Sequence, residues 1–465
     1  MRNKRALVWF QKDLRIHDNE VLVEASRHAE EVIPVYVFDD RDFKKKTEIL
    51  KTDKTGVIRS VFIAESVENL RANLLKRGSH LVVRSGISEE VLFQLAREFD
   101  IDAVYCNRER TRDEVFRQES LEKLLWSIGR EVRYSRGKML YYTSDLPFPI
   151  THAPDNFIQF RKEVERIIPV RLPLEEVEIP SFKPKINFDF GDVPEFWGDY
   201  NFELKGGEDA AMTNLRQLTH LIVEEKQKFK EVKPVLEMVF VYLADGCLSP
   251  KQLYHRSEKW RMRGGDPALS DYVKTILLWR DFYRLMGKKY RELIFEKGGV
   301  KQKPNNEASI DTTLFNIWKD GRTGFPYVDA CMRKLAAKGY LHNHEKKIVA
   351  SFLIHAMNLD WRLGAEYFES SFINYDPCSV WGMWNYIAGI SSDEKDGVEL
   401  NCLREAQKYD PDGDLVRKWI PALKDMPKKY IHKPFQLSEA ELKEFNIVLG
   451  ADYPSPIHTV NKMVY

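Results

Sequence analysis

The basic and aromatic side chains of this chain are the ones that most clearly suggest a chemical role. The 465 residues include 10 Trp and 20 Tyr, and planar side chains of this kind stack on flat ligands. Basic and aromatic residues together suit single-stranded nucleic acid. The balance of 72 Lys and Arg against 71 Asp and Glu leaves open that the charges are solvated helix faces. Trp260 lies among the basic residues, which are Lys226, Lys228, Lys230, Arg256, Lys259, Arg261, Arg263, Lys346 and Lys347.

Metal and nucleophile chemistry have little support in the sequence. The five cysteines are scattered and form no CxxC pair, which argues against a zinc site and indicates a reducing compartment. His342 and His344 are alternate residues without an acidic cluster beside them, so we expect no metal site. No apolar run approaches the roughly 18 residues of a membrane span, and the first ten residues lack a secretory apolar stretch. We expect a cytoplasmic protein that does not engage membranes.

The spacing of apolar runs predicts two regions joined by a connector. Short apolar runs at 6–10, 32–38, 81–84, 103–106 and 132–135 alternate with helical patterns at 19–28, 59–76, 89–99 and 115–128. This alternation is typical of an α/β domain with a doubly wound parallel sheet. The G-x-G-x-x-G fingerprint is missing, which disfavours a dinucleotide dehydrogenase. We therefore expect an α/β domain at 1–135, a proline-rich connector at 136–204 and an all-helical domain at 205–465.

Several long motifs resemble the photolyase/cryptochrome family. They are VWFQKDLRIHDN at 8–19, WRDFY at 279–283, GRTGFPYVDA at 321–330, HN at 342–343 and LDWR at 359–362. Four further segments resemble the DASH cryptochrome group within that family: LPF at 146–148, QFRK at 159–162, YDPCS at 375–379 and AQKYDP at 406–411. The resemblance runs from end to end and implies that the helical domain is of the flavin-binding type.

The resemblance implies a light-driven flavoprotein. Members of the family bind FAD in the helical domain and use blue light to pass an electron to a cyclobutane pyrimidine dimer flipped out of DNA. DASH members are similar but favour single-stranded DNA, which spares the unstacking energy of a duplex. A methenyltetrahydrofolate antenna often sits on the first domain, and Glu109 matches the glutamate that holds its pterin. By itself, Glu109 in a charge-rich segment is more typical of solvated surface.

The resemblance assigns six residues to the flavin site: Arg280, Asn343, Lys346, Asn374, Asp376 and Val380. Asp376 matches an aspartate that accepts a hydrogen bond from the edge of the isoalloxazine ring. Lys346 replaces an arginine, which keeps the charge but loses the planar fork, and Asn374 replaces its aspartate partner. Val380 stands where photolyases place an asparagine facing flavin N5, so we expect weaker stabilisation of the reduced flavin.

The phosphate-binding segment departs most from the family pattern. Counting back from the retained GCLSP at 246–250, the expected hydroxyl positions carry Leu236, Glu237, Met238, Val239 and Phe240. A carboxylate ~4 Å from a phosphate adds repulsion of about 4 kcal/mol at an effective dielectric near 20. We favour the interpretation that 235–243 is a packed core helix, which makes FAD binding doubtful.

The substrate and electron-transfer positions are also altered. Ile276 stands where repair enzymes carry a glutamate that hydrogen-bonds the dimer, while Trp279 and Tyr386 remain as possible stacking walls or core residues. Trp384 and Trp361 match the inner two members of the family's tryptophan relay. The outer member falls near Ala308, with no Trp or Tyr nearby, so the relay is expected to be interrupted.

Three functions remain open from the sequence. The chain is a repair enzyme of the deoxyribodipyrimidine photo-lyase type that prefers single-stranded DNA, or a blue-light sensor that holds flavin without repair. The alternative is a flavin-deficient relative that acts as a nucleic-acid or protein binding module. The end-to-end resemblance favours the first function, whereas Ile276 and Val380 favour the second and the altered phosphate segment favours the third.

Overall fold

The computed structural model describes residues 3–183, 188–196, 204–303 and 308–457. The N-terminal region is built on five parallel strands in the order β3-β2-β1-β4-β5. They are β1 (Asn3–Phe10), β2 (Ala29–Asp39), β3 (Val82–Gly86), β4 (Ala103–Asn107) and β5 (Glu131–Ser135). The five predicted strands and their parallel pairing are confirmed.

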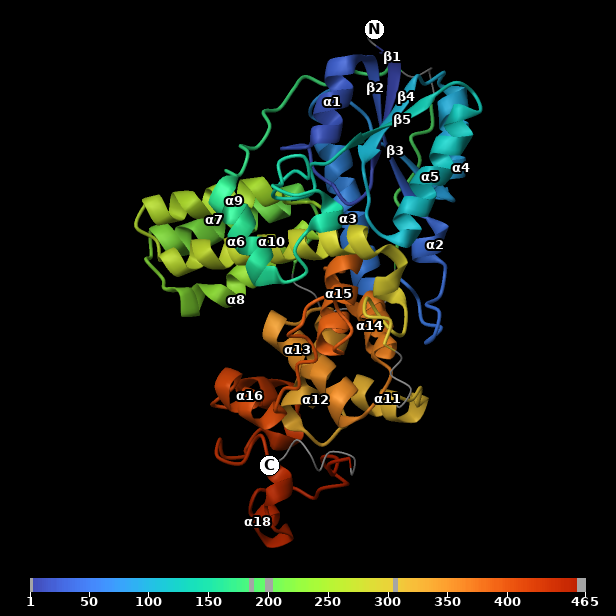
Figure 1. Ribbon diagram of the computed structural model, residues 1–465. Coiled ribbons are helices and arrows are strands. Elements are labelled where there is room, and N and C mark those ends of the chain that lie inside the picture. Colours follow the sequence, from blue (N-terminus) through green and yellow to red (C-terminus); the bar gives the residue numbers. More distant parts are fainter. Residues whose placement is uncertain (1–2, 184–187, 197–203, 304–307, 458–465) are drawn as a thin grey trace.

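Helices cover both faces of this sheet (Figure 1). One layer contains α1 (Glu20–His28) and α3 (Val57–Leu75), and the other contains α4 (Ser88–Glu98) and α5 (Arg112–Trp126). Val8 points to the first layer, where it shares a core with Leu22 and Phe62. Its neighbour Leu7 points to the second layer and packs with Leu121. Because alternate residues of a strand face opposite sides, the apolar runs of β1 and β2 are buried on both faces, as expected for a doubly wound sheet.

The helices beyond the sheet region form two groups in Figure 1 and are joined by long irregular segments. The first group contains α6 (Phe157–Ile167), α7 (Glu208–Val223), α8 (Phe229–Val239), α9 (Pro250–Met262) and α10 (Pro267–Tyr290). The second contains α11 (Thr312–Lys319), α12 (Pro326–Lys338), α13 (Asn343–Ser351), α14 (Trp361–Ser371), α15 (Pro377–Ile387), α16 (Cys402–Tyr409), α17 (Asp414–Trp419) and α18 (Glu439–Glu444). A short α2 (Asp40–Phe43) follows β2, and a π-helical turn (Phe352–Ala356) extends α13. The predicted architecture of an α/β domain followed by a helical domain is confirmed.

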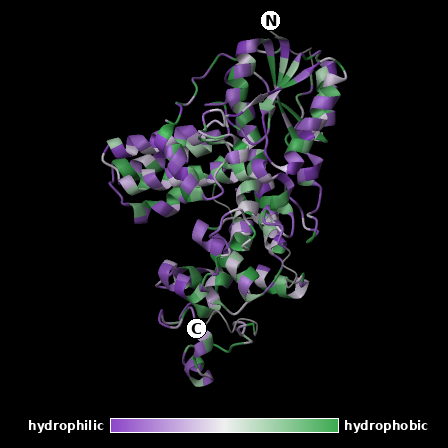
Figure 2. Cartoon of the chain, viewed as in Figure 1, coloured by the Kyte–Doolittle hydropathy of each residue, from purple (hydrophilic) through white to green (hydrophobic). Residues whose placement is uncertain are grey.

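Helix α10 connects the parts of the molecule. It packs against α9 in its own group and against α15 in the other. Asp281 on α10 also accepts backbone hydrogen bonds from Leu140 and Tyr141, at 3.1 and 2.9 Å, so the segment after the sheet is anchored on this helix. Residues 6–10 of β1 and 32–38 of β2 are mostly hydrophobic, whereas the outer helices alternate hydrophobic and hydrophilic residues (Figure 2). The division at residues 135 and 204 stays a prediction, with β5 ending at Ser135 and α7 beginning at Glu208.

Candidate functional site

A cleft opens at the carboxyl edge of the sheet, where the strand order changes direction. β1 and β4 are neighbours, and the connections that follow them run to opposite sides of the sheet. Such switch points are where α/β proteins bind ligands. The cleft has a volume of about 550 Å³, and its walls combine Lys12 and Glu114, which follow these strands, with Tyr375 and Trp381 from the helical region.

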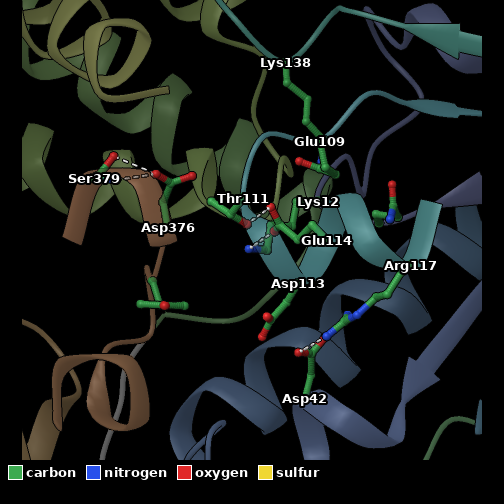
Figure 3. A network of polar contacts seen from close by, with 12 residues as sticks. Lys12, Asp42, Glu109, Thr111, Asp113, Glu114, Arg117, Lys138, Asp376 and Ser379 are labelled. Atoms are coloured by element: carbon green, nitrogen blue, oxygen red, sulfur yellow. Dashed lines mark hydrogen bonds and ion pairs between the residues drawn. The ribbon is translucent and has the colours of Figure 1, made fainter. Parts of the chain in front are cut away.

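The α/β side of this cleft is lined by paired charges (Figure 3). Burial alone would raise the pKa of the Glu114 carboxyl, but the neighbouring Lys12 ammonium outweighs it and lowers that pKa. Burial likewise opposes ionisation of Asp113, but Lys54 lowers its pKa to about 2. These carboxylates are therefore anions at neutral pH. The ion pairs are Lys12–Glu114 at 2.8 Å, Arg117–Asp42 at 2.5 Å and Lys54–Asp113 at 2.8 Å.

Glu109 is buried between two cations. Its exposed fraction is 3%, Lys138 donates to its Oε1, and Arg284 donates to its Oε2 at 3.3 Å. Arg284 also donates to Asp376 at 3.1 Å. The interpretation of Glu109 as solvated surface is therefore wrong, because this carboxylate links the end of β4 to α10 and α15.

Asp376 and Arg280, two predicted flavin residues, lie at this same junction. Asp376 caps α15 by accepting from the backbone N–H of Ser379 at 2.8 Å and from its hydroxyl at 2.7 Å. Burial opposes ionisation of Asp376, but Arg284 and Arg280 outweigh it and lower the pKa to about 2. Arg280 donates to the carbonyls of Lys138 and Leu243, while its Nε is buried without a partner among the described residues.

Glu237, at the position predicted to face the flavin phosphates, is buried and held by protein partners. The Tyr272 hydroxyl donates to Oε1, and His342 Nδ1 hydrogen-bonds to Oε2. Burial opposes ionisation of Glu237, but His342 and Tyr272 lower its pKa. Leu236 is fully buried beside it in the hydrophobic core. The Glu237 carboxylate thus occupies the Tyr272 hydroxyl and His342 Nδ1, so these groups are not available to a bound phosphate.

The other predicted flavin residues lie on α13 and around α15. Asn343 is the first residue of α13, and Lys346 follows one turn later. Burial lowers the pKa of Lys346 to about 8, and its ammonium lies 4.7 Å from the centre of the Phe372 ring. Asn374 has a buried Oδ1 without a partner among the described residues, while Val380 is 7% exposed in the helical core.

The residues present fit the ring half of a flavin better than its phosphates. Arg280 Nε and Asn374 Oδ1 are buried polar atoms without partners in the described part of the chain, and such atoms lose free energy unless a ligand or water satisfies them. The carboxylate of Glu237 opposes a second anion in its neighbourhood. The strongest disagreement between these residues and a bound flavin is therefore at the phosphate end.

The predicted substrate residues are engaged in internal packing. Trp279 stacks on Phe157 with ring centres 3.7 Å apart and planes 10° apart, and it also stacks on Tyr283 at 5.3 Å. Ile276 packs on the first core, and Tyr386 packs on the second. The structure does not gather these three side chains around one cavity of the described chain that we could identify with a substrate.

The two inner relay tryptophans are both buried. Trp384 is 0% and Trp361 is 3% exposed. The Trp384 ring lies 6.5 Å from Trp318, and the Trp361 ring lies 5.5 Å from Trp381. The outer position was expected near Ala308, and residues 305–307 of that segment lie outside the described residues.

Trp260, expected to stack on nucleic acid among the basic residues, is a core residue. It is 1% exposed, and its Nε1 donates to the Thr219 hydroxyl at 3.0 Å. Among the residues that the structure describes, no three His, Cys, Asp or Glu side chains are grouped to hold a metal ion. In the same residues, no helix has the length and apolar character to cross a membrane.

Sequence reasoning missed most of the cleft residues. Of its predicted site residues, Glu109 alone is in the cleft wall, whereas Lys12, Asp42, Arg117 and Asp245 also line it. The available signal was position: residues 11–12 and 109–114 directly follow β1 and β4, at the edge where a switch point is expected. Asp245 comes from the helical region, and its approach to the sheet depends on tertiary packing.

Two family models match this chain. Residues 6–180 match the DNA photolyase model, and residues 273–464 match the FAD binding domain of DNA photolyase. The second match supports flavin binding, and neither favours the flavin-deficient alternative. Glu237 and α8 lie between the two matched ranges.

Relatives and solved structures cover nearly the whole chain. A cryptochrome DASH of Synechocystis sp. is 37% identical over 97% of this chain and 94% of its own length, and one of Xenopus laevis is 36% identical over 96% and 88%. The crystal structure of a Synechocystis sp. PCC6803 cryptochrome matches at 35% identity and a TM-score of 0.89, covering 98% of this chain and 96% of that one. A bacterial class III photolyase from Agrobacterium tumefaciens matches at 27% identity and a TM-score of 0.82, covering 98% and 94%. With this fold and these matches, the chain belongs to the photolyase/cryptochrome family, among the DASH cryptochromes.

Proposed function

We propose that this chain is a blue-light-responsive flavoprotein whose function is light sensing. The match of residues 273–464 to a FAD binding domain supports the flavin. The unpartnered buried atoms of Arg280 and Asn374 support a polar ring ligand beside them.

In this proposal six residues hold the flavin: Arg280, Asn343, Lys346, Asn374, Asp376 and Val380. A bound flavin supplies blue-light absorption and an excited state that accepts an electron. Asp376 is ionised at neutral pH and fixed by Ser379, so it is suited to accept a hydrogen bond from the ring edge. Lys346 supplies a positive charge near the ring, and Val380 supplies an apolar contact.

Trp384 and Trp361 are the proposed electron donors. Both indoles are buried, which keeps water from the oxidised side chain. The Nε1–H of Trp384 is buried without a hydrogen-bond partner among the described residues. Trp384 would donate first, and Trp361 would then refill it.

The observation that carries sensing over repair is the packing of Trp279. Its ring stacks on Phe157 at 3.7 Å, so this face is already occupied by the protein. Ile276 offers shape but no hydrogen bond to the edge of a flipped base, which repair enzymes must read. We therefore propose that the protein absorbs light and transfers an electron to the flavin but does not repair a pyrimidine dimer.

Blue-light repair of cyclobutane pyrimidine dimers in single-stranded DNA is the second candidate. The match of residues 6–180 to the DNA photolyase model favours it and suggests DNA as a partner. Its reaction would be that of a deoxyribodipyrimidine photo-lyase, a carbon–carbon lyase.

We also propose a methenyltetrahydrofolate antenna in the cleft at the carboxyl edge of the sheet. The cleft volume of about 550 Å³ is within the range of small-molecule sites, and Glu109 is part of its wall. A photolyase from Sulfolobus tokodaii is described with two FAD molecules, one of them implicated in light harvesting, which supports a second chromophore in this family.

The proposed location is the cytoplasm. All five cysteines are free and buried, and free thiols are typical of a reducing compartment.

Sensing and repair are distinguished by illuminating the flavin-loaded protein in one reductant-containing buffer. One sample is followed by absorption, and a second contains ultraviolet-irradiated single-stranded oligothymidine whose dimers are counted. Sensing predicts flavin bleaching in blue light with an unchanged number of dimers. Loss of several dimers per protein would establish the repair function instead.

A further inference from the structure

Asp245 is an acidic residue of the cleft wall with one carboxylate oxygen unpaired among the described residues. It lines the cleft and is 5% exposed, and its Oδ2 is buried without a hydrogen bond among the described residues. Burial raises the pKa of its carboxyl group, and Lys12, Arg59 and Lys138 oppose this shift. A buried polar atom left unpaired destabilises the folded protein, and a ligand that donates a hydrogen bond to Asp245 would remove this penalty.

Backbone contacts hold Asp245 in the wall of the cleft. Its carbonyl accepts from the backbone N–H of Leu14 at 3.0 Å. The next residue, Gly246, has a φ of +70°, and a Cβ there would lie 2.4 Å from the carbonyl of Lys12. Only glycine permits this close approach, and the approach places Asp245 beside the end of β1.

The nearby carboxylates of the cleft differ from Asp245 because they are already paired. Glu109 is bound by Lys138 and Arg284, and Glu114 by Lys12. The cations nearest to Asp245 in electrostatic influence are Lys12, Arg59 and Lys138. Arg59 donates instead to the carbonyls of Lys54, Glu369 and Phe372 and to the Thr55 hydroxyl. These cations favour an anionic carboxylate without occupying it.

Flat side chains complete the surroundings. Phe295, Tyr375 and Trp381 line the same cleft, and the Trp381 Nε1 donates to the Tyr375 hydroxyl at 3.0 Å, which fixes both rings. The cleft wall thus combines aromatic rings with the unpaired carboxylate oxygen of Asp245. Such a wall suits a planar heterocycle that carries hydrogen-bond donors on one edge. A carboxylate is matched in plane by a ring N–H next to an amino group.

We propose that Asp245 selects the cleft ligand by accepting hydrogen bonds from the 2-amino-4-oxopyrimidine edge of a fused heterocycle. This rests on the proposed antenna function of the cleft and assigns the reading of the ring to Asp245 rather than Glu109, whose oxygens are engaged. Pterins and guanine share this edge. Asp245 is therefore a specificity-determining residue for the cleft ligand.

The first test needs no variant. Binding of pterin, lumazine and guanosine to the full chain is measured by equilibrium dialysis at low salt. Lumazine has an oxygen in place of the 2-amino group, so we expect it to bind about tenfold or more weakly than pterin. Guanosine binding as tightly as pterin would indicate a nucleotide ligand for the same edge, whereas pterin alone indicates a folate-type ligand. Equal binding of pterin and lumazine, or no binding of either 2-amino compound, overturns the proposal.

The second test uses Asp245→Asn, which keeps the shape of the side chain. The pterin preference over lumazine should fall to about twofold or less, because an amide offers one weaker acceptor. Asp271→Asn is the matched control, since Asp271 is paired with Arg261 outside the cleft, and its preference should equal that of the parent chain. Methenyltetrahydrofolate is titrated in parallel. Equal binding to the parent and to Asp245→Asn overturns the role of Asp245 and preserves the antenna, whereas no binding to the parent overturns both.

Discussion

At the scale of single residues, Glu237 is the residue most relevant to whether the chain binds the phosphates of FAD. The side chain is buried, and its two oxygens are engaged by Tyr272 and His342. Because a carboxylate repels a phosphate in a poorly solvated wall, we expect Glu237 to weaken FAD binding if the phosphates lie beside it.

Replacing Glu237 by serine should tighten FAD binding. The change removes the charge and supplies a hydroxyl donor, and we expect the Kd of FAD to fall by about tenfold, measured by quenching of flavin fluorescence. Glu225→Ser is the control, since Glu225 is exposed and contacts His220 and Gln227 rather than Tyr272 or His342. An unchanged Kd in Glu237→Ser would mean that the phosphates lie elsewhere.

Asp376 gives the protein a defined acid sensitivity. Its folded-state pKa of about 2 lies below the ordinary value of about 3.9. Its stabilisation is therefore complete above pH 4 and is lost as the pH falls from about 4 to 2. The free energy of unfolding should decline by about 2 kcal/mol from this group over that range, and urea titrations of Asp376→Asn should show a decline smaller by that amount. A parallel decline in the variant would contradict the assignment.

At the scale of elements, α10 is the helix on which the site depends. Arg280 and Arg284 are one turn apart, so they share a face, and both approach Asp376. Asp281 faces the segment that follows β5 and holds it by two backbone hydrogen bonds.

Asp281→Ala should destabilise the protein by about 2–4 kcal/mol, because two buried backbone N–H groups lose their acceptor. Asp281→Asn keeps one carbonyl acceptor and should lose about half as much. Urea unfolding followed by circular dichroism measures both. Equal losses in the two variants would show that packing, rather than these hydrogen bonds, anchors the segment.

The elements themselves were predictable from sequence to a large extent, and the site was predictable only in part. The strands at 6–10 and 32–38 are β-branched and aromatic runs buried on both faces, so their local pattern and final environment agree. Glu109 was interpreted as solvated because its neighbours in sequence are charged, yet Lys138 and Arg284 come from distant segments. Trp260 was interpreted with the basic residues around it, although its face of α9 is buried. The spacing of hydrophobic residues along the sequence does not predict contacts between segments that are far apart in the chain.

At the scale of the whole molecule, contacts between the α/β domain and the second helical group join the two walls of the cleft. The backbone N–H groups of Ile49 and Leu50 donate to Glu366 on α14 at 2.9 and 2.8 Å. Arg59 on α3 donates to the carbonyl of Phe372 at 3.1 Å. The loop between α2 and α3 is thus held against α14 across the cleft.

Glu366→Ala should release this loop while leaving the fold intact. We expect trypsin to cleave among Lys44, Lys45, Lys46 and Lys51 at least about fivefold faster, since two backbone donors lose their acceptor and the loop opens locally. Glu90→Ala, a change at an exposed residue of α4 outside this loop, is the control and should be cut at the parent rate. Cleavage of both variants at equal rates would argue against the fastening.

The central claim is that this chain is a flavoprotein, and an absorption spectrum of the purified protein before and after addition of FAD tests it most directly. We expect a flavin band that approaches one equivalent per chain with added FAD and that bleaches under blue light in the presence of a reductant. A protein that stays colourless after FAD is added and the excess is removed would contradict the claim, and both light-driven functions would fall with it.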